Sequence, residues 1–286
     1  MSRPVVVVTG GASGIGAACC KVIADAGLHV VVADVSEAAG KQVASDVGGD
    51  FVAIDVGDAA GVDAAAQAIE ARFGAVAGLV TSAGVIQPPL PPEELDLGLW
   101  DRIVHIDQRG TYVTCLAFGR RMAARGTGGA IVNIASVAGS RSMPLHSYAP
   151  AKAAVISMTA CLASAWGRDG VRVNSVSPGY TATPGLQTEI DAGRRDVSRL
   201  VGNAPLGRLV QPSEIGQAVA FLLSPAASAI SGIDLPVDCG WLAGSTWATY
   251  GGLPSPQQGV ATCRGRPRRM ASRAIRGCST FIAPCC

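Results

Sequence analysis

The chain has 286 residues, of which 49% are hydrophobic and 15% are charged. This composition excludes a largely disordered chain, and the length allows one large α/β domain or two small ones. No apolar run reaches the ~18–20 residues that a membrane-spanning helix needs, and the N-terminal run of four valines is too short for a signal peptide. We therefore expect neither a membrane partner nor secretion.

The net charge of +2 is unevenly distributed along the chain. Residues 245–286 contain six arginines and no acidic residue, so residues 1–244 hold 17 basic and 21 acidic side chains, a net charge of −4. A mildly acidic body predicts no nucleic-acid partner. The nine cysteines show no metal-ligand spacing, so we expect no metal site. Their odd number, without a secretion signal, favours reduced thiols in the cytoplasm.

Residues 1–244 alternate predicted strands with predicted helices. The strands are expected at Val5–Thr9, His29–Ala33, Phe51–Ile54, Ala77–Thr81, Ala130–Ala135, Val171–Val176 and Ile233–Val237. The helices are expected at Gly14–Ala26, Ser36 to Gly48, Asp58–Phe73, Asp96–Ala124, Ser147–Arg168 and from Pro212 onward. Continuous β-branched runs are typical of parallel strands that are covered on both faces. Repeated βα units with short connections therefore predict an α/β fold with a single Rossmann-like, doubly wound parallel sheet of about seven strands.

The hydrophobic periodicity ends near Ser245, which divides the chain into a domain at 1–244 and a basic, Cys-containing tail at 245–286. In the tail, Gly, Pro, Ser, Gln and Arg replace the apolar pattern. One interpretation is an anion- or nucleic-acid-binding arm. The interpretation that we favour is a disordered extension without a selected role, because arginines without interleaved aromatic residues indicate RNA binding only weakly.

A glycine-rich segment, Thr9 to Gly16, directly follows the first predicted strand and opens the first predicted helix. Glycines allow a tight turn and a close backbone approach to a pyrophosphate, and the helix N-terminus offers free N–H groups to that anion. The segment therefore predicts a dinucleotide-binding loop. Its candidate cofactor-binding residues are Gly10, Ser13, Gly14, Ile15 and Gly16.

An acidic residue, Asp34, ends the second predicted strand. A carboxylate at this position can accept hydrogen bonds from both adenosine ribose hydroxyls and repels a 2′-phosphate, so the sequence predicts NAD rather than NADP. A solvated aspartate at the strand end is the alternative. Asp55 and Val56, after the third strand, are expected to face the adenine.

Tyr148 and Lys152 are four residues apart on a predicted helix, so their side chains share one face. A tyrosine hydroxyl is a weak acid, and an ammonium close by stabilises its ionised form, which can then act as a base. Ser136, at the end of the fifth strand, can hydrogen-bond a substrate oxygen and orient it. These three residues predict acid–base catalysis, although a Tyr–Lys pair alone is common on helix surfaces.

Together these motifs resemble the classical short-chain dehydrogenase/reductase family over residues 4–244. They follow the family's order: the Thr9 to Gly16 segment, Asp55-Val56, Ala83-Gly84, Ser136, Tyr148-Ala-Pro-Ala-Lys152, Asn174 and Pro178-Gly179. The resemblance implies reversible hydride transfer between a nicotinamide cofactor and an alcohol/carbonyl pair. It assigns Tyr148 as the general acid/base and Ser136 as the group that positions the reacting oxygen. Lys152, besides its effect on Tyr148, would also bind the nicotinamide ribose.

The resemblance implies further cofactor contacts on other loops. These would come from Ser82, Ala83, Gly84, Pro178, Gly179, Thr181 and Thr183. For the two threonines, ordinary loop capping is the alternative. The segment Pro184–Arg208 matches the family's variable region that covers the substrate. Family members are commonly tetramers, so we expect a homotetramer or homodimer.

Two positions depart from the family pattern. The family has Asn-Asn-Ala-Gly where this chain has Thr81-Ser82-Ala83-Gly84, and it has asparagine where this chain has Asp107. The family asparagine anchors a water-mediated proton path toward the catalytic lysine. We therefore assign Asp107 to the catalytic group and hypothesise that it keeps this relay and makes its titration pH-dependent. Neutral drift to a residue of the same shape is the alternative.

These observations predict a cytoplasmic, NAD-dependent oxidoreductase. Its expected substrate is a small secondary alcohol or ketone of the polyol, sugar or cyclic-diol type. Two alternatives stay open: a 3-oxoacyl thioester reductase, and a dinucleotide-binding regulator without catalytic activity.

Overall fold

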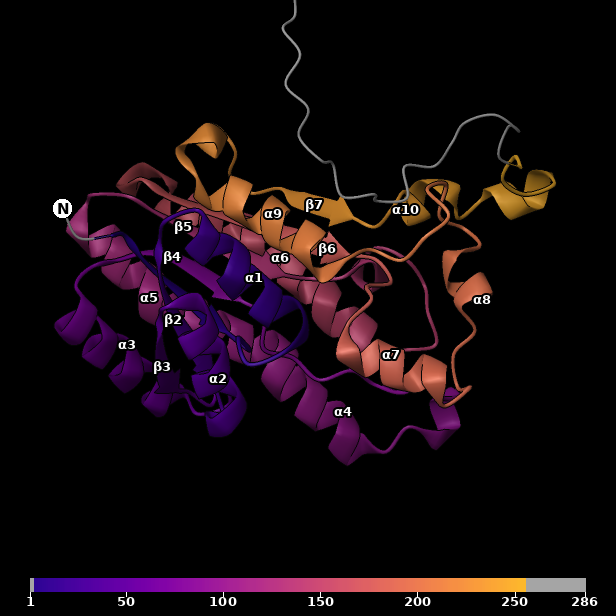
Figure 1. Cartoon of the computed structure of the whole chain (residues 1–286), viewed down its shortest axis with the longest axis horizontal. Coiled ribbons are helices and arrows are strands. Elements are labelled where there is room, and N and C mark those ends of the chain that lie inside the picture. The colour runs from indigo at the N-terminus through magenta and orange to yellow at the C-terminus, as the bar shows by residue number, and fades with distance from the viewer. Residues whose placement is uncertain (1–2, 256–286) are drawn as a thin grey trace, which may run out of the picture. The chain divides into compact units, whose positions relative to one another are not determined.

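The computed structural model describes residues 3–255, which contain one seven-stranded sheet (Figure 1). Its strands are β1 (Val5–Thr9), β2 (His29–Asp34), β3 (Asp50–Ala53), β4 (Val76–Thr81), β5 (Gly129–Ile134), β6 (Val171–Pro178) and β7 (Asp234–Val237). All neighbouring strands are parallel, in the spatial order β3-β2-β1-β4-β5-β6-β7. The predicted doubly wound sheet is thus confirmed.

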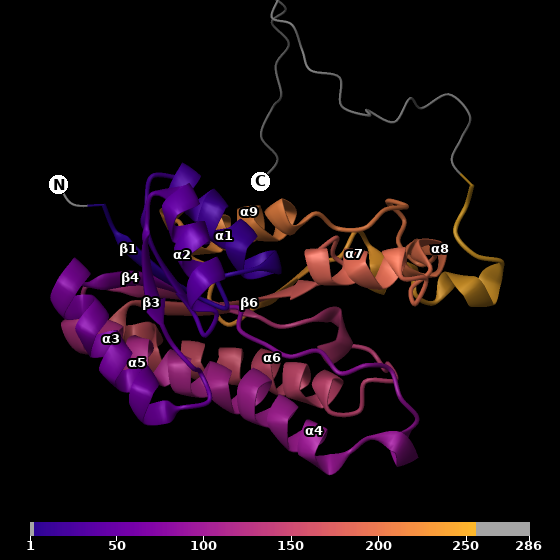
Figure 2. The same cartoon turned by 60° about the horizontal axis from the view of Figure 1, so that its bottom comes forward.

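Helices cover both faces of the sheet, with α1, α2 and α9 on one side and α3, α5 and α6 on the other (Figure 2). The helices are α1 (Gly14–Asp25), α2 (Glu37–Val47), α3 (Ala59–Phe73), α4 (Leu97–Ile103), α5 (Thr111–Arg125), α6 (Tyr148–Trp166), α7 (Pro184–Asp191), α8 (Val197–Val201), α9 (Pro212–Leu223) and α10 (Trp241–Gly244). None of the helices among the described residues is long and apolar enough to cross a membrane.

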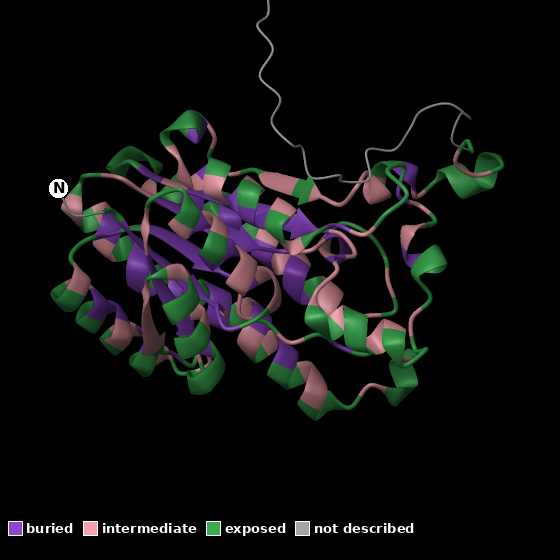
Figure 3. Ribbon diagram, viewed as in Figure 1, coloured by how far each residue is buried: buried purple, intermediate pink, exposed green. Residues whose placement is uncertain are grey.

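The valine run of β1 is buried on both faces, as Figure 3 shows for the central strands. Val6 and Val8 belong to the core under α1 and α9, together with Ile215. Val5 and Val7 belong to the core on the opposite face, together with the side chain of Phe118 on α5. Because successive strand residues point to opposite faces, a strand between two helical layers needs apolar residues at every position.

The long helix predicted at 96–124 is present from Leu97 to Arg125, but it is not a regular α-helix throughout. Between α4 and α5 lies a π-helical segment, η2 (Val104–Gly110), whose turns are wider than those of an α-helix. The Thr111 hydroxyl donates to the Asp107 carbonyl at 2.8 Å, and the Thr114 hydroxyl donates to the Gly110 carbonyl at 2.7 Å. The apolar pattern continues through η2, so hydrophobic periodicity did not show the change of helix type.

The segment Pro184–Arg208, for which the sequence predicted no elements, contains α7 and α8. Each helix begins at a side-chain cap. Thr183 Oγ1 accepts a hydrogen bond from the Leu186 N–H, and Asp196 Oδ1 accepts one from the Ser198 N–H. Threonine and aspartate are preferred N-cap residues, so Thr183 and Asp196 could have indicated from the sequence where these short helices begin.

A 3₁₀ turn at Trp247–Tyr250 lies within the segment predicted as a tail. The six arginines and four cysteines of that tail lie outside the described residues. The division of the chain at residue 244 therefore stays a prediction.

A buried polar network joins β4, β5, α5 and α6 behind the carboxyl ends of the strands. Asn133 Oδ1 accepts hydrogen bonds from Thr81 Oγ1 at 2.8 Å and Cys115 Sγ at 3.1 Å, and Asn133 Nδ2 donates to Thr159 Oγ1 at 2.9 Å. All four side chains are fully or almost fully buried. Since unpaired polar groups are costly in such surroundings, the network fixes the spacing of these elements.

Replacing Asn133 with Ala should lower the free energy of unfolding by about 2–4 kcal/mol, because three buried polar groups lose their partner. Urea denaturation measures this change. The matched control is Gln42→Ala on the exposed face of α2, which should change stability by about 0.5 kcal/mol or less. Equal effects of the two substitutions would show that the network adds nothing to stability.

Candidate active site

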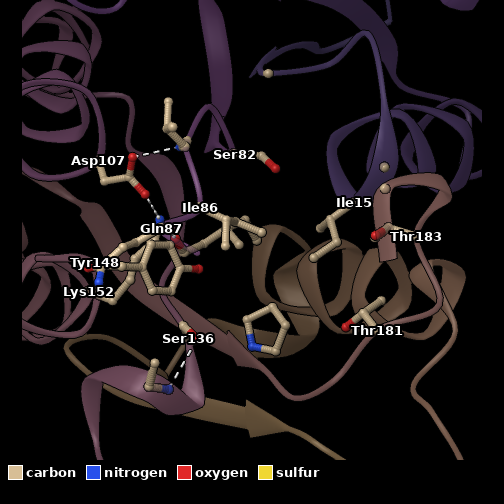
Figure 4. Close-up of a pocket in the computed structure, with 18 of the residues that line it drawn as sticks. Ile15, Ser82, Ile86, Gln87, Asp107, Ser136, Tyr148, Lys152, Thr181 and Thr183 are labelled. Carbon is tan, nitrogen blue, oxygen red and sulfur yellow. Dashed lines mark hydrogen bonds and ion pairs between the residues drawn. The ribbon is translucent and has the colours of Figure 1, made fainter. Parts of the chain in front are cut away.

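A cleft of about 1300 Å³ opens at the carboxyl ends of the strands (Figure 4). It lies where β1 and β4 are neighbours and the chain leaves the two strands in opposite directions, the usual ligand site of doubly wound sheets. Every residue that the sequence predicts for catalysis or cofactor binding lines this cleft. They are Gly10, Ser13, Gly14, Ile15, Gly16, Asp34, Asp55, Val56, Ser82, Ala83, Gly84, Asp107, Ser136, Tyr148, Lys152, Pro178, Gly179, Thr181 and Thr183.

The glycine-rich loop between β1 and α1 has no room for side chains at two positions. Gly10 has a φ of +68°, and a Cβ there would lie 2.5 Å from the Ala83 backbone nitrogen. A Cβ on Gly16 would collide with the Gly10 carbonyl oxygen. Ser13 is the N-cap of α1, and its hydroxyl makes no capping hydrogen bond. The loop thus presents backbone and the positive end of a helix to the cleft, which fits a pyrophosphate.

The carboxylate of Asp34 is fixed by two backbone donors at the end of β2. Oδ2 accepts a hydrogen bond from the Ala12 N–H at 3.0 Å, and Oδ1 accepts one from the Ser36 N–H at 2.9 Å. These bonds hold the negative charge at the edge of the cleft and leave each oxygen a further lone pair. Asp34 therefore combines a local structural role with the geometry expected of an acceptor for ribose hydroxyls.

Tyr148, Lys152 and Ser136 come together in the same part of the cleft (Figure 4). Tyr148 is the first residue of α6, and the Lys152 ammonium lies 5.5 Å from the centre of its ring. Lys152 Nζ also donates to the Ile134 carbonyl at 3.2 Å. Ser136 Oγ accepts a hydrogen bond from the Ala138 N–H at 3.1 Å, so its own O–H can still donate to a substrate oxygen.

Asp107 forms a buried ion pair with Lys152. Its Oδ2 atom lies 3.3 Å from Lys152 Nζ, and its Oδ1 atom accepts a hydrogen bond from the Val85 N–H at 2.7 Å. The side chain of Asp107 is 0% exposed. Gly84 leaves room for the pair, since a Cβ there would lie 3.0 Å from Asp107 Oδ2.

Burial and charge act in opposite directions on this pair. Burial raises the pKa of Asp107 above its ordinary value, although Lys152 and the Val85 N–H oppose this shift. Burial disfavours the charged form of Lys152, but Asp107 and Tyr148 outweigh it, so the pKa of Lys152 is also raised. Lys152 is therefore held as an ammonium beside Tyr148.

The loop after β6 contributes the opposite wall of the cleft. Thr181 Oγ1 donates to the Gly179 carbonyl at 2.9 Å, and Thr183 caps α7. Both threonines thus have the local hydrogen bonds expected of loop capping while they line the cleft. Asn174 does not reach the cleft; its side chain bonds the backbone of Ile230 and Ile233 ahead of β7.

Gln87, a polar residue in the wall of the cleft, was not among the site residues predicted from the sequence. Its side chain is fully buried, and Oε1 accepts hydrogen bonds from the Ser147 N–H at 2.8 Å, the Ser147 hydroxyl at 2.7 Å and the Tyr148 N–H at 3.4 Å. The available signal was a single amide side chain inside the apolar, Pro-rich segment 85–92.

The cleft, the glycine-rich loop and the Tyr–Lys pair define a Rossmann-type oxidoreductase. The chain belongs to the short-chain dehydrogenase/reductase family. The family model that matches it, described as enoyl-(acyl carrier protein) reductase, covers residues 10–242.

Among curated proteins, the chain is 39% identical over 247 residues to cis-4-hydroxycyclohexanecarboxylate dehydrogenase of Sinomonas cyclohexanicum, covering 84% of this chain and 96% of that protein. It is 41% identical over 243 residues to D-threitol dehydrogenase of Mycolicibacterium smegmatis, covering 83% and 92%. Among solved structures, one named ribose-5-phosphate isomerase from Brucella melitensis is 50% identical, with a TM-score of 0.86 and coverage of 89% and 98%.

The raised pKa of Asp107 predicts a pH-dependent difference in stability between the wild type and Asp107→Asn. A carboxyl whose pKa is raised by folding stabilises the fold below its ordinary value of 3.8, and this contribution is lost as pH rises through the folded pKa. As pH rises from about 4 to 7, the wild type should therefore lose stability relative to the variant. Urea denaturation of both proteins across this range measures the gap. A gap that stays constant with pH would contradict the shift.

Proposed function

We propose that the protein oxidises a secondary alcohol of the polyol or cyclic-diol type with NAD, and that Tyr148 is the general base. The observation that carries this proposal is the meeting of Tyr148 and Lys152 with the glycine-rich loop in one cleft. The similar hydroxycyclohexanecarboxylate and threitol dehydrogenases support the substrate class, because both are named for alcohols that carry further oxygen atoms.

Each residue has a role that follows from its position. A nicotinamide dinucleotide bound in the cleft would supply the acceptor for hydride. Ser136 would donate a hydrogen bond to the substrate oxygen, and Tyr148 would take the hydroxyl proton. Lys152, kept charged by Asp107, would stabilise the phenolate and bind the nicotinamide ribose. Asp107 would also connect this group to the Val85 backbone, as part of a proton path.

Three other functions make different predictions. The name of the 50% identical structure suggests an isomerase of a sugar phosphate, which would need no nicotinamide cofactor. A 3-oxoacyl thioester reductase would oxidise NADPH or NADH with a 3-oxoacyl thioester. A regulator would bind NAD without turnover. The glycine-rich loop, which suits a dinucleotide, favours the alcohol dehydrogenase. The presence of Ser136, Tyr148 and Lys152 in the same cleft favours it as well.

The purified full chain should reduce NAD when it is offered polyols and cyclic diols, and Tyr148→Phe should lower kcat about 10²–10⁴-fold. The absorbance of NADH measures the rate. Tyr250→Phe is the matched control, because Tyr250 is 87% exposed and does not line the cleft. Tight NAD binding without turnover of any alcohol would favour the regulator, and isomerisation of ribose 5-phosphate without added NAD would favour the isomerase.

Asp34 should determine the choice between NAD and NADP. Asp34→Asn removes the negative charge but keeps an oxygen that can accept a backbone hydrogen bond. Without like-charge repulsion, the ratio of kcat/KM for NADP to that for NAD should rise about 10-fold or more. Steady-state kinetics with each cofactor test this, and Asp46→Asn on the far end of α2 is the control. An unchanged ratio would leave Asp34 with its local structural role alone.

We also propose assembly as a homotetramer or homodimer. Tyr112 and Leu116 on α5 leave 45% and 40% of their surfaces exposed and supply apolar area for such contacts.

A further inference from the structure

The amide of Gln87 has an orientation that its hydrogen bonds determine. The N–H groups of Ser147 and Tyr148 can only donate, so the atom that faces them must be the oxygen, Oε1. These two N–H groups lie at the start of α6, where no helical carbonyl can accept their hydrogen bonds. Gln87 therefore supplies the missing acceptor for the turn that carries Tyr148.

The other half of the amide has no partner. Gln87 Nε2 is fully buried and finds no hydrogen-bond acceptor among the described residues. A buried donor without an acceptor is unfavourable, and such groups are rare. Gln87 lines the cleft together with Ile86 and Pro88, while Nε2 is covered from bulk water. Because Gln87 belongs to the lining of the cleft, a molecule bound there can supply the missing acceptor.

We propose that Gln87 binds a second hydroxyl of the substrate through Nε2 and so selects diols and polyols over simple alcohols. The proposal rests on the proposed function, because it requires an alcohol whose reacting hydroxyl faces Tyr148. Gln87 Oε1 contacts the backbone of that same tyrosine, so the second hydroxyl belongs to the molecule that is being oxidised. A neutral amide donor suits an uncharged hydroxyl oxygen. No step of the reaction passes through Gln87, which makes it a specificity residue.

Two substitutions separate the donor of Gln87 from its role at the start of α6. In Gln87→Glu a carboxylate oxygen still accepts the Ser147 and Tyr148 N–H groups, and negative charge is favourable at a helix N-terminus. Gln87→Met has a similar length but can neither accept nor donate a hydrogen bond. Gln87→Met therefore loses both the acceptor for α6 and the donor, whereas Gln87→Glu keeps the acceptor, replaces the donor with a second acceptor and buries a charge.

The experiment compares cyclohexanol with the cyclohexanediols, which share one ring and differ in the second hydroxyl. For each variant, kcat/KM is measured by NADH absorbance, and the ratio of diol to monoalcohol is taken for the 1,2-diol and the 1,4-diol. We expect the ratio for the preferred diol to fall about 10- to 100-fold in Gln87→Met and less in Gln87→Glu, whose second carboxylate oxygen can accept the O–H of the same hydroxyl. Gln42→Glu, on the exposed surface of α2, makes the same chemical change away from the cleft and should leave the ratio unchanged.

The outcomes distinguish the two proposals. If both Gln87 variants keep the wild-type ratio of kcat/KM for the diol to that for the monoalcohol, Nε2 does not bind the substrate. Its acceptor is then a structural water or none. If Gln87→Met lowers kcat/KM for the diol and the monoalcohol equally, the effect comes from the lost cap of α6, and the proposal is also wrong. If the wild type oxidises none of these alcohols, while binding NAD, the proposed function itself fails.

Discussion

The buried contact between Asp107 and Lys152 is the constraint on which the rest of the site depends. Through Asp107 it connects the π-helical segment to the backbone after β4, and through Lys152 it connects α6 to the end of β5. A buried charge is tolerated only with an opposite charge and hydrogen bonds around it, so both residues must stay in place. The carboxyl ends of β4 and β5 and the start of α6 are thereby held in one arrangement around Tyr148.

The parallel sheet makes that arrangement achievable. Because all strands run in the same direction, the loops after β1, β2, β4, β5 and β6 meet at one edge, and residues far apart in the sequence line one cleft. The Asn133 network lies directly behind this edge and fixes the separation of β4, β5 and α6. Stability and the geometry of the site are therefore properties of the same buried polar groups.

Much of this could be predicted from the sequence, because the relevant signals are local. Valine runs and capping residues indicate strands and helices, and the glycines at 10 and 16 are explained by backbone contacts that exclude a Cβ. Gln87 was not predicted because its importance depends on Ser147 and Tyr148, sixty residues away, which only the folded chain brings within hydrogen-bond distance. The π-helical segment was missed because widening a turn leaves the apolar pattern intact.

That widened turn also limits how this part of the chain can change. A π-helical turn contains more residues than an α-helical turn, so η2 accommodates an additional residue while α4 and α5 keep their relative orientation. Loss of one residue there can be absorbed by conversion to a regular α-helix, whereas loss of one residue within α4 or α5 would turn every side chain beyond it by about 100°. The wider turn carries Asp107, so such a conversion would move its carboxylate relative to Lys152. The length of the chain at this turn is thus restricted by the buried ion pair and not by the orientation of α5.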